Sequence, residues 1–350
     1  MNSQRLVQYE LLRILAMCGV VMNHVFNYGL HIYDDFCVDT STKLGFMCWS
    51  ILELMKLFSL PSVNCYVLIT GYFLIGNRHL RLKGIWKVWS ITWLYGVGIY
   101  LIAVIIGITP FEINQLCRHA TPLLSKTYWF VTSYIILLLL SPFLARVLQC
   151  LSKRQYQIAL VVGGVVCFQF LLGQIVMDEQ QILLFVYLFM IGGYIRQYAD
   201  KPSRNINVLL CYVGILLVMY ACTLYKNKPL SNSCFTIFAM AYHGLVLPLS
   251  VAFFIYVKNW KIDHQRLRKC ILSIAPLSFA VYIIHTHPIV DKWLWASVSA
   301  WVERCQFYFL PFVCIIITLS VFVVGIIIEY LRVAMTKRLN SVWRNTTKDV

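Results

Sequence analysis

The sequence predicts an all-α membrane protein, a polytopic helical bundle of about ten transmembrane helices with both termini in the cytoplasm. Two observations predict this class. Of the 350 residues, 60% are hydrophobic and only 13% are charged, and the mean hydropathy is +0.73, whereas soluble domains are about 45–50% apolar and 25% charged. The hydrophobic residues also fall into runs long enough to cross a bilayer. The same composition excludes disordered, collagen-like and secreted disulfide-rich proteins.

Each apolar run of the sequence predicts one membrane-spanning segment. A span needs roughly 20 mostly apolar residues. Pro61 is expected to break the second run into an outer part, 46–58, and an inner part, 59–75, and no other interrupted helix is expected. The first run lacks a small-residue cleavage site and is interpreted as a retained helix rather than a signal peptide. The runs lie at about 11–31, 46–75, 85–108, 128–149, 157–173, 182–198, 206–225, 233–257, 271–291 and 308–332.

The connections between these runs are too short to hold a soluble catalytic domain. The sequence therefore predicts one integral-membrane domain over residues 1–350, with a core at about 5–335 and a cytoplasmic tail at 336–350. Any activity must come from the helices and their short loops.

Loop charge orients the bundle. With the N-terminus inside, 22 of the 30 basic residues lie on the inner side and seven in outer loops, which is the positive-inside pattern. The net charge of +16 thus indicates topology and contact with anionic lipid rather than binding of nucleic acid. The expected location is a cell membrane, the bacterial cytoplasmic membrane. The outer basic residues are Lys43, Arg118, Lys126, Lys226, Lys228, Lys292 and Arg304.

The thirteen cysteines show no spacing suited to a metal site, and no metal is expected. Most lie inside apolar runs, where cysteine serves as a small hydrophobic residue. Cys37, Cys117 and Cys305 fall in outer loops, where a disulfide is conceivable.

The first run contains three ionisable residues that are costly in a bilayer, Glu10, Arg13 and His24. Arg13 and His24 are eleven residues apart, so they share one helix face, about 16 Å apart along the axis. Arg13 alone is explained by snorkelling to the headgroups, and His24 alone by a satisfied core histidine. The pair on one face favours a functional site.

His285 in the ninth run is expected at a depth similar to that of His24, because both helices run outward and each histidine follows the inner end by a similar number of residues. Two imidazoles at one depth predict a single buried polar site. Tyr282 lies one turn earlier and can share the face of His285. His287 is instead interpreted as a residue of the outer rim.

A basic cluster follows the second run on the cytoplasmic side. Arg78 and Arg81 are its centre, with His79, Lys83 and Lys87 nearby. Arginine pairs bind phosphate well through bidentate donors, but an inner loop of an ordinary membrane protein has the same composition.

Other polar pairs are expected to be structural. Glu53 and Lys56, and Glu329 and Arg332, are each three residues apart on a helix and can form ion pairs. Tyr128, Trp129 and Phe130 open an aromatic stretch of the kind found at membrane interfaces.

These residues resemble the acyltransferase-3 family of membrane acyltransferases along nearly the whole chain. The family pattern of an Arg, ten residues and a His is met by Arg13 and His24, with Glu10 at the acidic position. Further matches are ITGYFL with Thr70 at a position usually Ser, the Arg-x-x-Arg of Arg78 and Arg81, the stretch from Trp129 to Pro142, and Tyr282 with His285. The Glu-x-x-Tyr of some members is absent, because Tyr330 directly follows Glu329.

The resemblance implies transfer of an acyl group, usually acetyl, from cytoplasmic acyl-CoA to a sugar hydroxyl of a surface polysaccharide or lipid-linked glycan. His24 would be the general base, with His285 and Tyr282 orienting the acceptor or stabilising the oxyanion. Arg13 is expected to be a catalytic residue with His24 and His285, and also to bind the CoA co-substrate together with Arg78 and Arg81. Trp129 and Glu10 would contact substrate. No tightly bound cofactor is expected.

Two alternatives belong to other functional classes. The buried His and Arg could line the path of a transporter or flippase, or the chain could be a structural partner of a polysaccharide assembly machine. The enzymatic interpretation requires a cavity that links a positively charged inner mouth, including Arg13, to the paired imidazoles of His24 and His285.

Overall fold

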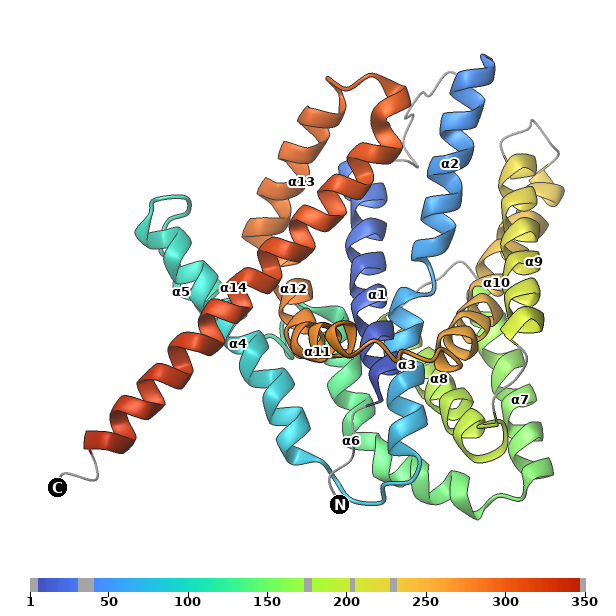
Figure 1. The fold of residues 1–350 in the computed structure, drawn as a ribbon, viewed down its shortest axis with the longest axis horizontal. Coiled ribbons are helices and arrows are strands. Elements are labelled where there is room, and N and C mark those ends of the chain that lie inside the picture. Colours follow the sequence, from blue (N-terminus) through green and yellow to red (C-terminus); the bar gives the residue numbers. More distant parts are fainter. Residues whose placement is uncertain (1–5, 31–40, 173–177, 202–204, 227–231, 347–350) are drawn as a thin grey trace.

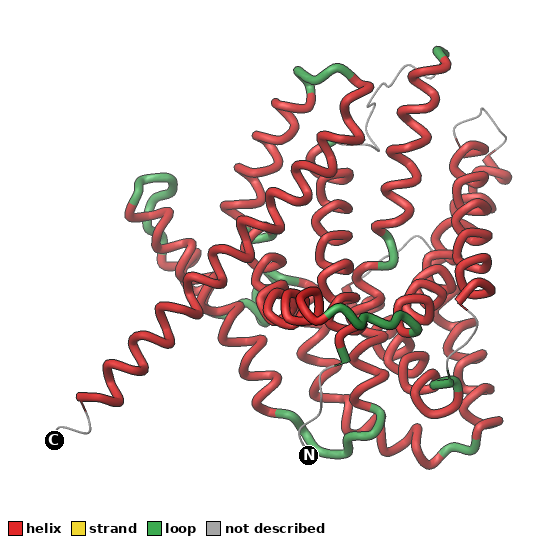
Figure 2. Tube along the Cα trace, viewed as in Figure 1, coloured by secondary structure: helices red, strands yellow, loops and turns green. Residues whose placement is uncertain are grey.

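The computed structural model describes residues 6–30, 41–172, 178–201, 205–226 and 232–346. Over these ranges the chain is helical and contains no strand, so the predicted all-α class is confirmed (Figures 1 and 2). Its elements are α1 (Val7–His24), the π-helix η1 (Val25–Gly29), α2 (Lys43–Ser59), α3 (Ser62–Leu74), α4 (Leu82–Ile105), α5 (Ile113–Ala120), α6 (Trp129–Cys150), α7 (Lys153–Leu172), α8 (Asp178–Tyr198), α9 (Asn205–Lys226), α10 (Asn232–Lys258), α11 (Gln265–Ile274), the 3₁₀ turn η2 (Ala275–Leu277), α12 (Ser278–His285), α13 (Pro288–Val302), the 3₁₀ turn η3 (Phe307–Phe309) and α14 (Leu310–Thr346).

Each predicted run is helical over most of its described residues. Seven helical segments of the described chain are long and apolar enough to cross a membrane, and the protein is a polytopic bundle. The predicted spans 157–173 and 182–198 correspond to α7 and α8. In the span predicted at 233–257, α10 contributes the shorter apolar stretch Gly244–Lys258. The predicted tail continues α14 as far as Thr346.

The break predicted at Pro61 is confirmed. α2 ends at Ser59 and α3 begins at Ser62, with Pro61 as the N-cap of α3. Proline has no N–H to donate into the preceding turn and its ring clashes with that turn. The helix therefore stops and restarts at this point.

The span predicted over 271–291 is present as the span-length segment Gln265–His285, but its predicted continuation to residue 291 was wrong. α12 ends at His285 and a new helix, α13, begins at Pro288. The Nδ1 atom of the N-cap His287 accepts a hydrogen bond from the Ile289 N–H at 3.3 Å. Proline suits the first turn of a helix but not its interior, so the sequence contained the reason for this break.

The bundle packs around α1, whose buried residues join a core shared with α3, α6, α8 and α12 (Figure 1). Glycines allow α3 and α8 to approach closely. A Cβ at Gly71 would lie 2.3 Å from the Phe189 carbonyl oxygen, and one at Gly192 would lie 2.4 Å from the Leu68 oxygen. Only glycine fits at these two positions.

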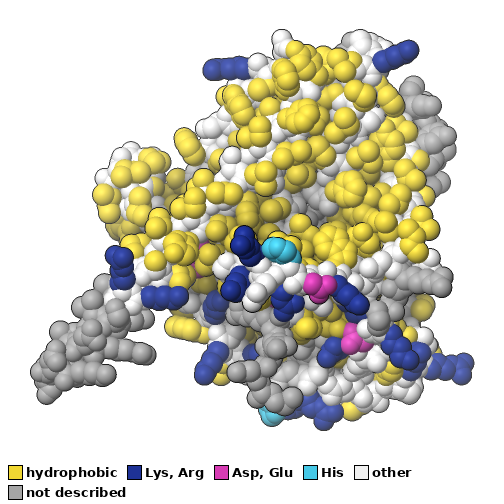
Figure 3. Space-filling model, viewed as in Figure 1, with side chains coloured by type: hydrophobic (Ala, Val, Ile, Leu, Met, Phe, Trp, Pro, Cys, Tyr) yellow, Lys and Arg dark blue, Asp and Glu magenta, His cyan; other side chains and the backbone are white. Residues whose placement is uncertain are grey.

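Charge is distributed unevenly over the molecule. On the face shown in Figure 3, hydrophobic side chains cover the upper part, whereas most Lys and Arg side chains gather across the lower part. The start of α1 and the end of α14 also lie toward that lower part in Figure 1. This arrangement agrees with both termini lying on the basic, inner side.

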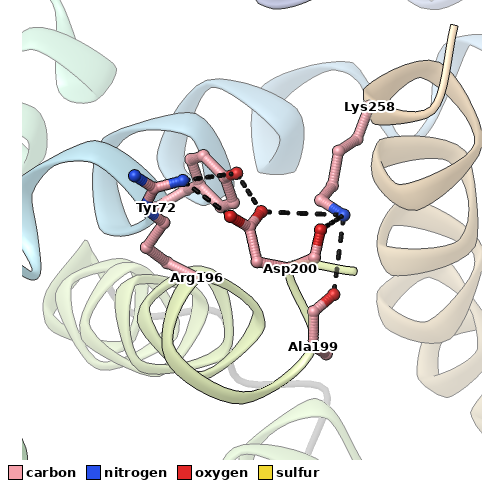
Figure 4. A network of polar contacts seen from close by, with 5 residues as sticks. All are labelled: Tyr72, Arg196, Ala199, Asp200 and Lys258. Carbon is pink, nitrogen blue, oxygen red and sulfur yellow. Dashed lines mark hydrogen bonds and ion pairs between the residues drawn. The ribbon is translucent and has the colours of Figure 1, made fainter. Parts of the chain in front are cut away.

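A polar network ties together the inner ends of α3, α8 and α10 (Figure 4). Arg196 donates to Asp200 Oδ2 at 2.8 Å and to the Tyr72 hydroxyl at 3.1 Å, and that hydroxyl donates to Asp200. The buried Lys258 donates to the Asp200 carbonyl oxygen at 2.9 Å, and its Nζ lies 3.7 Å from Asp200 Oδ1. Two inner cations are thus paired with one carboxylate, which indicates a structural role.

Candidate active site

His24 and His285 are in hydrogen-bond contact. His285 Nε2 lies 3.0 Å from His24 Nδ1, and the ring centroids are 5.0 Å apart. Each histidine ends a regular helix: α1 changes into the π-helix after His24, and α12 stops at His285. π-helical turns are frequent at functional sites. The sequence analysis expected the two imidazoles at one depth, but it did not predict these helix irregularities.

When both rings are neutral, the hydrogen bonds determine which nitrogen of each imidazole carries the proton. His285 Nδ1 lies 2.6 Å from the Val281 carbonyl oxygen, which can only accept, so Nδ1 carries a proton. His285 Nε2 is then an acceptor, and His24 Nδ1–H donates to it. His24 Nε2 is left as an unprotonated nitrogen. The arrangement therefore supplies a proton acceptor on a half-buried side chain held by a fully buried one.

Two aromatic residues complete the surroundings of the pair, and the sequence analysis missed both. The Trp295 ring lies edge-on to both imidazoles, 6.3 Å from each, and its Nε1 donates to Asp291 Oδ1 at 2.9 Å. The Tyr28 ring lies 5.3 Å from the His24 ring and is 47% exposed. Trp295 belongs to α13, a helix that was not predicted, so no sequence pattern connected it to His24.

Tyr282 lies beside His285, with a centroid distance of 6.1 Å. Its ring also contacts Phe130, at 5.6 Å, and Tyr128, at 6.4 Å. Trp129 instead packs against Phe130 and Phe185. Tyr282 therefore borders the histidine pair, whereas the ring contacts of Trp129 lie on α6 and α8.

Arg13 forms an ion pair with Glu10, with Nη1 2.8 Å from Oε1, and its side chain is 36% exposed. The Tyr66 hydroxyl donates to the Arg13 carbonyl oxygen at 2.8 Å. The structure thus joins two of the predicted site residues into one pair. Arg13 lies about 16 Å along the helix axis from His24.

An apolar cavity of about 700 Å³ reaches His285. α4, α12, α13 and α14 form its walls, and its lining includes Arg332, Tyr95 and Trp293 but not Arg13. Ser320 and Arg332 both line it, so it extends about 18 Å along α14. This cavity therefore links His285, but not His24, to Arg332 on α14 rather than to the expected Arg13.

The Arg332 side chain is held in place by hydrogen bonds to Glu329. Its Nε and Nη2 each donate to the buried Glu329 at 2.6 Å, and the Tyr95 hydroxyl donates to Glu329 Oε2 at 2.7 Å. The ion pair predicted between Glu329 and Arg332 is confirmed. The pair predicted between Glu53 and Lys56 is also present, at 3.9 Å.

The predicted phosphate-binding residues Arg78 and Arg81 lie between α3 and α4, and both are exposed. Arg78 Nε donates to Gln149 Oε1 at 2.7 Å, and Arg146 Nη2 donates to the Arg78 carbonyl oxygen at 3.4 Å. α6 thus adds a third arginine to this cluster. The sequence placed Arg146 on the inner side, but its proximity to Arg78 depends on tertiary packing.

The described part of the chain contains neither a metal-binding group of side chains nor a disulfide among the candidate cysteines. Its His, Cys, Asp and Glu side chains form no group of three able to hold a metal ion. Cys117 and Cys305 are free thiols. Cys37, the third candidate for a disulfide, lies outside the described residues.

Fold and site together define a helical integral membrane protein with a buried pair of imidazoles. Residues 6–330 match the family described as Acyltransferase domain, so the chain belongs to the acyltransferase-3 family. It is a membrane acyltransferase. Searches of curated proteins and of solved structures found no match.

Proposed function

We propose that this protein moves a short acyl group, acetyl being the usual one, from cytoplasmic acyl-CoA to a hydroxyl of a cell-surface polysaccharide or lipid-linked glycan. The observation that carries the proposal is the hydrogen-bonded chain from Val281 through His285 to His24, which leaves His24 Nε2 free to accept a proton. The site would work in a bacterial cytoplasmic membrane.

His24 acts as the general base. Its Nε2 takes the proton of the acceptor hydroxyl while the hydroxyl oxygen attacks the thioester carbonyl carbon. The resulting tetrahedral intermediate collapses, the C–S bond breaks, and the proton returns from His24 to the CoA sulfur. His285 is a positioning residue in this scheme, because its Nε2 fixes the tautomer and orientation of His24.

The inner side of the protein offers cations for the polyanionic donor. The exposed Arg78, Arg81 and Arg146 can bind CoA phosphates bidentately. The apolar cavity with Arg332 near one end and His285 on its wall supports a route by which the thin thioester end of the donor approaches the histidines. Arg13, paired with Glu10, adds a further cation on α1.

Tyr282, Tyr28 and Trp295 surround the histidine pair. Aromatic rings with an apolar body and a polar tip suit sugar surfaces at a membrane interface. In this account, Tyr28 and Tyr282 border the acceptor, and Trp295 keeps the two imidazoles in contact.

The interrupted helices at Pro61 and Pro288 are a feature that transporters also have. Vesicles containing the protein separate the two functions. With labelled acetyl-CoA on the cytoplasmic side and the glycan fraction of the source cell outside, label is expected in glycan ester. If a labelled solute crosses without any CoA thioester and no ester forms, the proposed function is wrong.

A further inference from the structure

A second cavity of about 550 Å³ lies between α5, the outer end of α4 and the start of α13. It is more polar than the cavity that reaches His285. By the charge-based topology it faces the outer side of the membrane. Its lining includes Arg118, His119 and Lys292, together with Glu112, Gln115 and Trp293. We refer to it as the outer cleft.

Two residues that line the outer cleft, Tyr100 and His119, belong to a stack of three rings. The Tyr100 and His119 centroids are 5.1 Å apart, and those of His119 and His287 are 4.8 Å apart and nearly parallel. His287 Nε2–H donates to the Gly96 carbonyl oxygen at 3.1 Å, while its Nδ1 accepts from Ile289. Both nitrogens of His287 are therefore used within the protein.

His119 differs from His287, because its buried Nδ1 has no hydrogen-bond partner among the described residues. The side chain is only 4% exposed and lines the cleft. Burial and the neighbouring Arg118 lower the pKa of His119, which favours a neutral ring. An unpartnered buried nitrogen is costly, and a ligand hydroxyl can satisfy it when the His119 ring turns so that this nitrogen faces the cleft.

The charge on the cleft wall favours an anion. Arg118 and Lys292 are exposed and form no ion pair with a residue that the structure describes, and they outnumber the single carboxylate, Glu112. Trp293 lines the outer cleft and also the cavity that contains His285. A ligand in the cleft thus lies next to the path to the histidine pair.

We propose that the outer cleft binds an acidic sugar unit of the acceptor glycan, with its carboxylate on Arg118 and Lys292 and a hydroxyl on His119. This inference rests on the proposed function, because it assigns the acceptor of that reaction. It adds a binding site and a substrate class: glycans that contain uronic or sialic acids.

Binding of defined sugars tests the proposal without catalysis. The purified protein in phosphatidylcholine nanodiscs is titrated with a glucuronate-containing tetrasaccharide and a sialyl trisaccharide, each beside its carboxyl-reduced form, by ligand-observed NMR. At least one acidic sugar is expected to bind tenfold or more tightly than its reduced form. Equal affinity within both pairs, or no binding by either acidic sugar, overturns the proposal.

Matched variants locate the binding site. The double variant Arg118→Ala plus Lys292→Ala is expected to lose the preference for the acidic sugar, whereas Lys43→Ala plus Arg304→Ala, which removes the same charge elsewhere on the outer side, keeps it. Unchanged binding by the first variant contradicts the proposal. Loss of sugar binding when phosphatidylglycerol replaces phosphatidylcholine would assign the cleft to a lipid headgroup and would also overturn it.

His24→Ala separates this proposal from the proposed function. The variant is expected to bind the acidic sugar as tightly as the unaltered protein does. If His24→Ala retains acyl transfer, the proposed general base is wrong, but the binding result still decides whether the outer cleft recognises acidic sugars.

Discussion

At the scale of single residues, the site depends on which nitrogen of His24 is free. The sequence predicted that His24 and His285 occupy one site, because buried ionisable residues at matching depths are costly without a shared use. It could not predict the hydrogen bond from His285 to the Val281 oxygen, since this requires the end of α12 to be in place. That bond gives His24 and His285 different roles.

His285→Ala tests the positioning role. Without the acceptor nitrogen of His285, the His24 ring loses the contact that fixes its orientation. We expect kcat to fall by about 10²-fold, the lower end of the range for general-base catalysis, with the KM values for acyl-CoA and acceptor unchanged. His79→Ala, which removes an exposed histidine, is the control. A rise in KM at constant kcat would show that His285 binds substrate instead.

The arginine cluster is tested by Arg78→Ala plus Arg81→Ala. Both side chains are exposed, so their removal leaves the core intact, and the KM for acyl-CoA is expected to rise about tenfold, equivalent to about 1.4 kcal/mol. Lys153→Ala plus Arg154→Ala removes equal charge from the same side of the membrane. An equal rise in both variants would indicate a general surface potential rather than a CoA site.

At the scale of helices, prolines determine where the helices around the site break. The break at Pro61 was predicted because the apolar run around it is too long for one span. The break at Pro288 was missed, because Asp291 and Lys292 resemble loop residues. As a result, α13 and its Trp295 were absent from the predicted site. Contacts between distant helices, such as that of Trp295 with His24, require three-dimensional packing.

The close contact between α3 and α8 gives a prediction about stability. Gly71→Ala would place a methyl group against the Phe189 backbone, and overpacking of this kind costs about 1–3 kcal/mol. We expect a lower thermal midpoint in detergent. Gly214→Ala on α9 has open space around the added methyl and should leave the midpoint unchanged or raise it. Equal midpoints for the two variants would contradict the packing of α3 on α8.

At the scale of the whole molecule, the all-α polytopic fold class was the most predictable property. Composition and loop charge alone predicted an all-α bundle with a basic inner side, because bilayer thickness and the positive-inside rule act on the chain as a whole. Cavities were not predictable. The cavity at His285 contains Arg332 rather than the expected Arg13, because its position depends on how α4, α12 and α14 pack together.

Thiol labelling of intact cells tests this topology. In a background without the exposed native cysteines Cys117, Cys150, Cys211 and Cys270, and without Cys37 and Cys305, which the sequence places in outer loops, a membrane-impermeant maleimide should label Arg304→Cys. Arg154→Cys should react only after the cells are permeabilised. Labelling of Arg154→Cys in intact cells would reverse the orientation and remove the cytoplasmic donor from the account.

The central claim is that His24 is the general base of an acyl transfer. Membranes containing either the unaltered protein or His24→Ala are supplied with labelled acetyl-CoA and the acceptor glycan, and label in glycan ester is measured at equal protein abundance. The account predicts that His24→Ala lowers the transfer rate by about 10²–10⁴-fold. Transfer at the unaltered rate would contradict it.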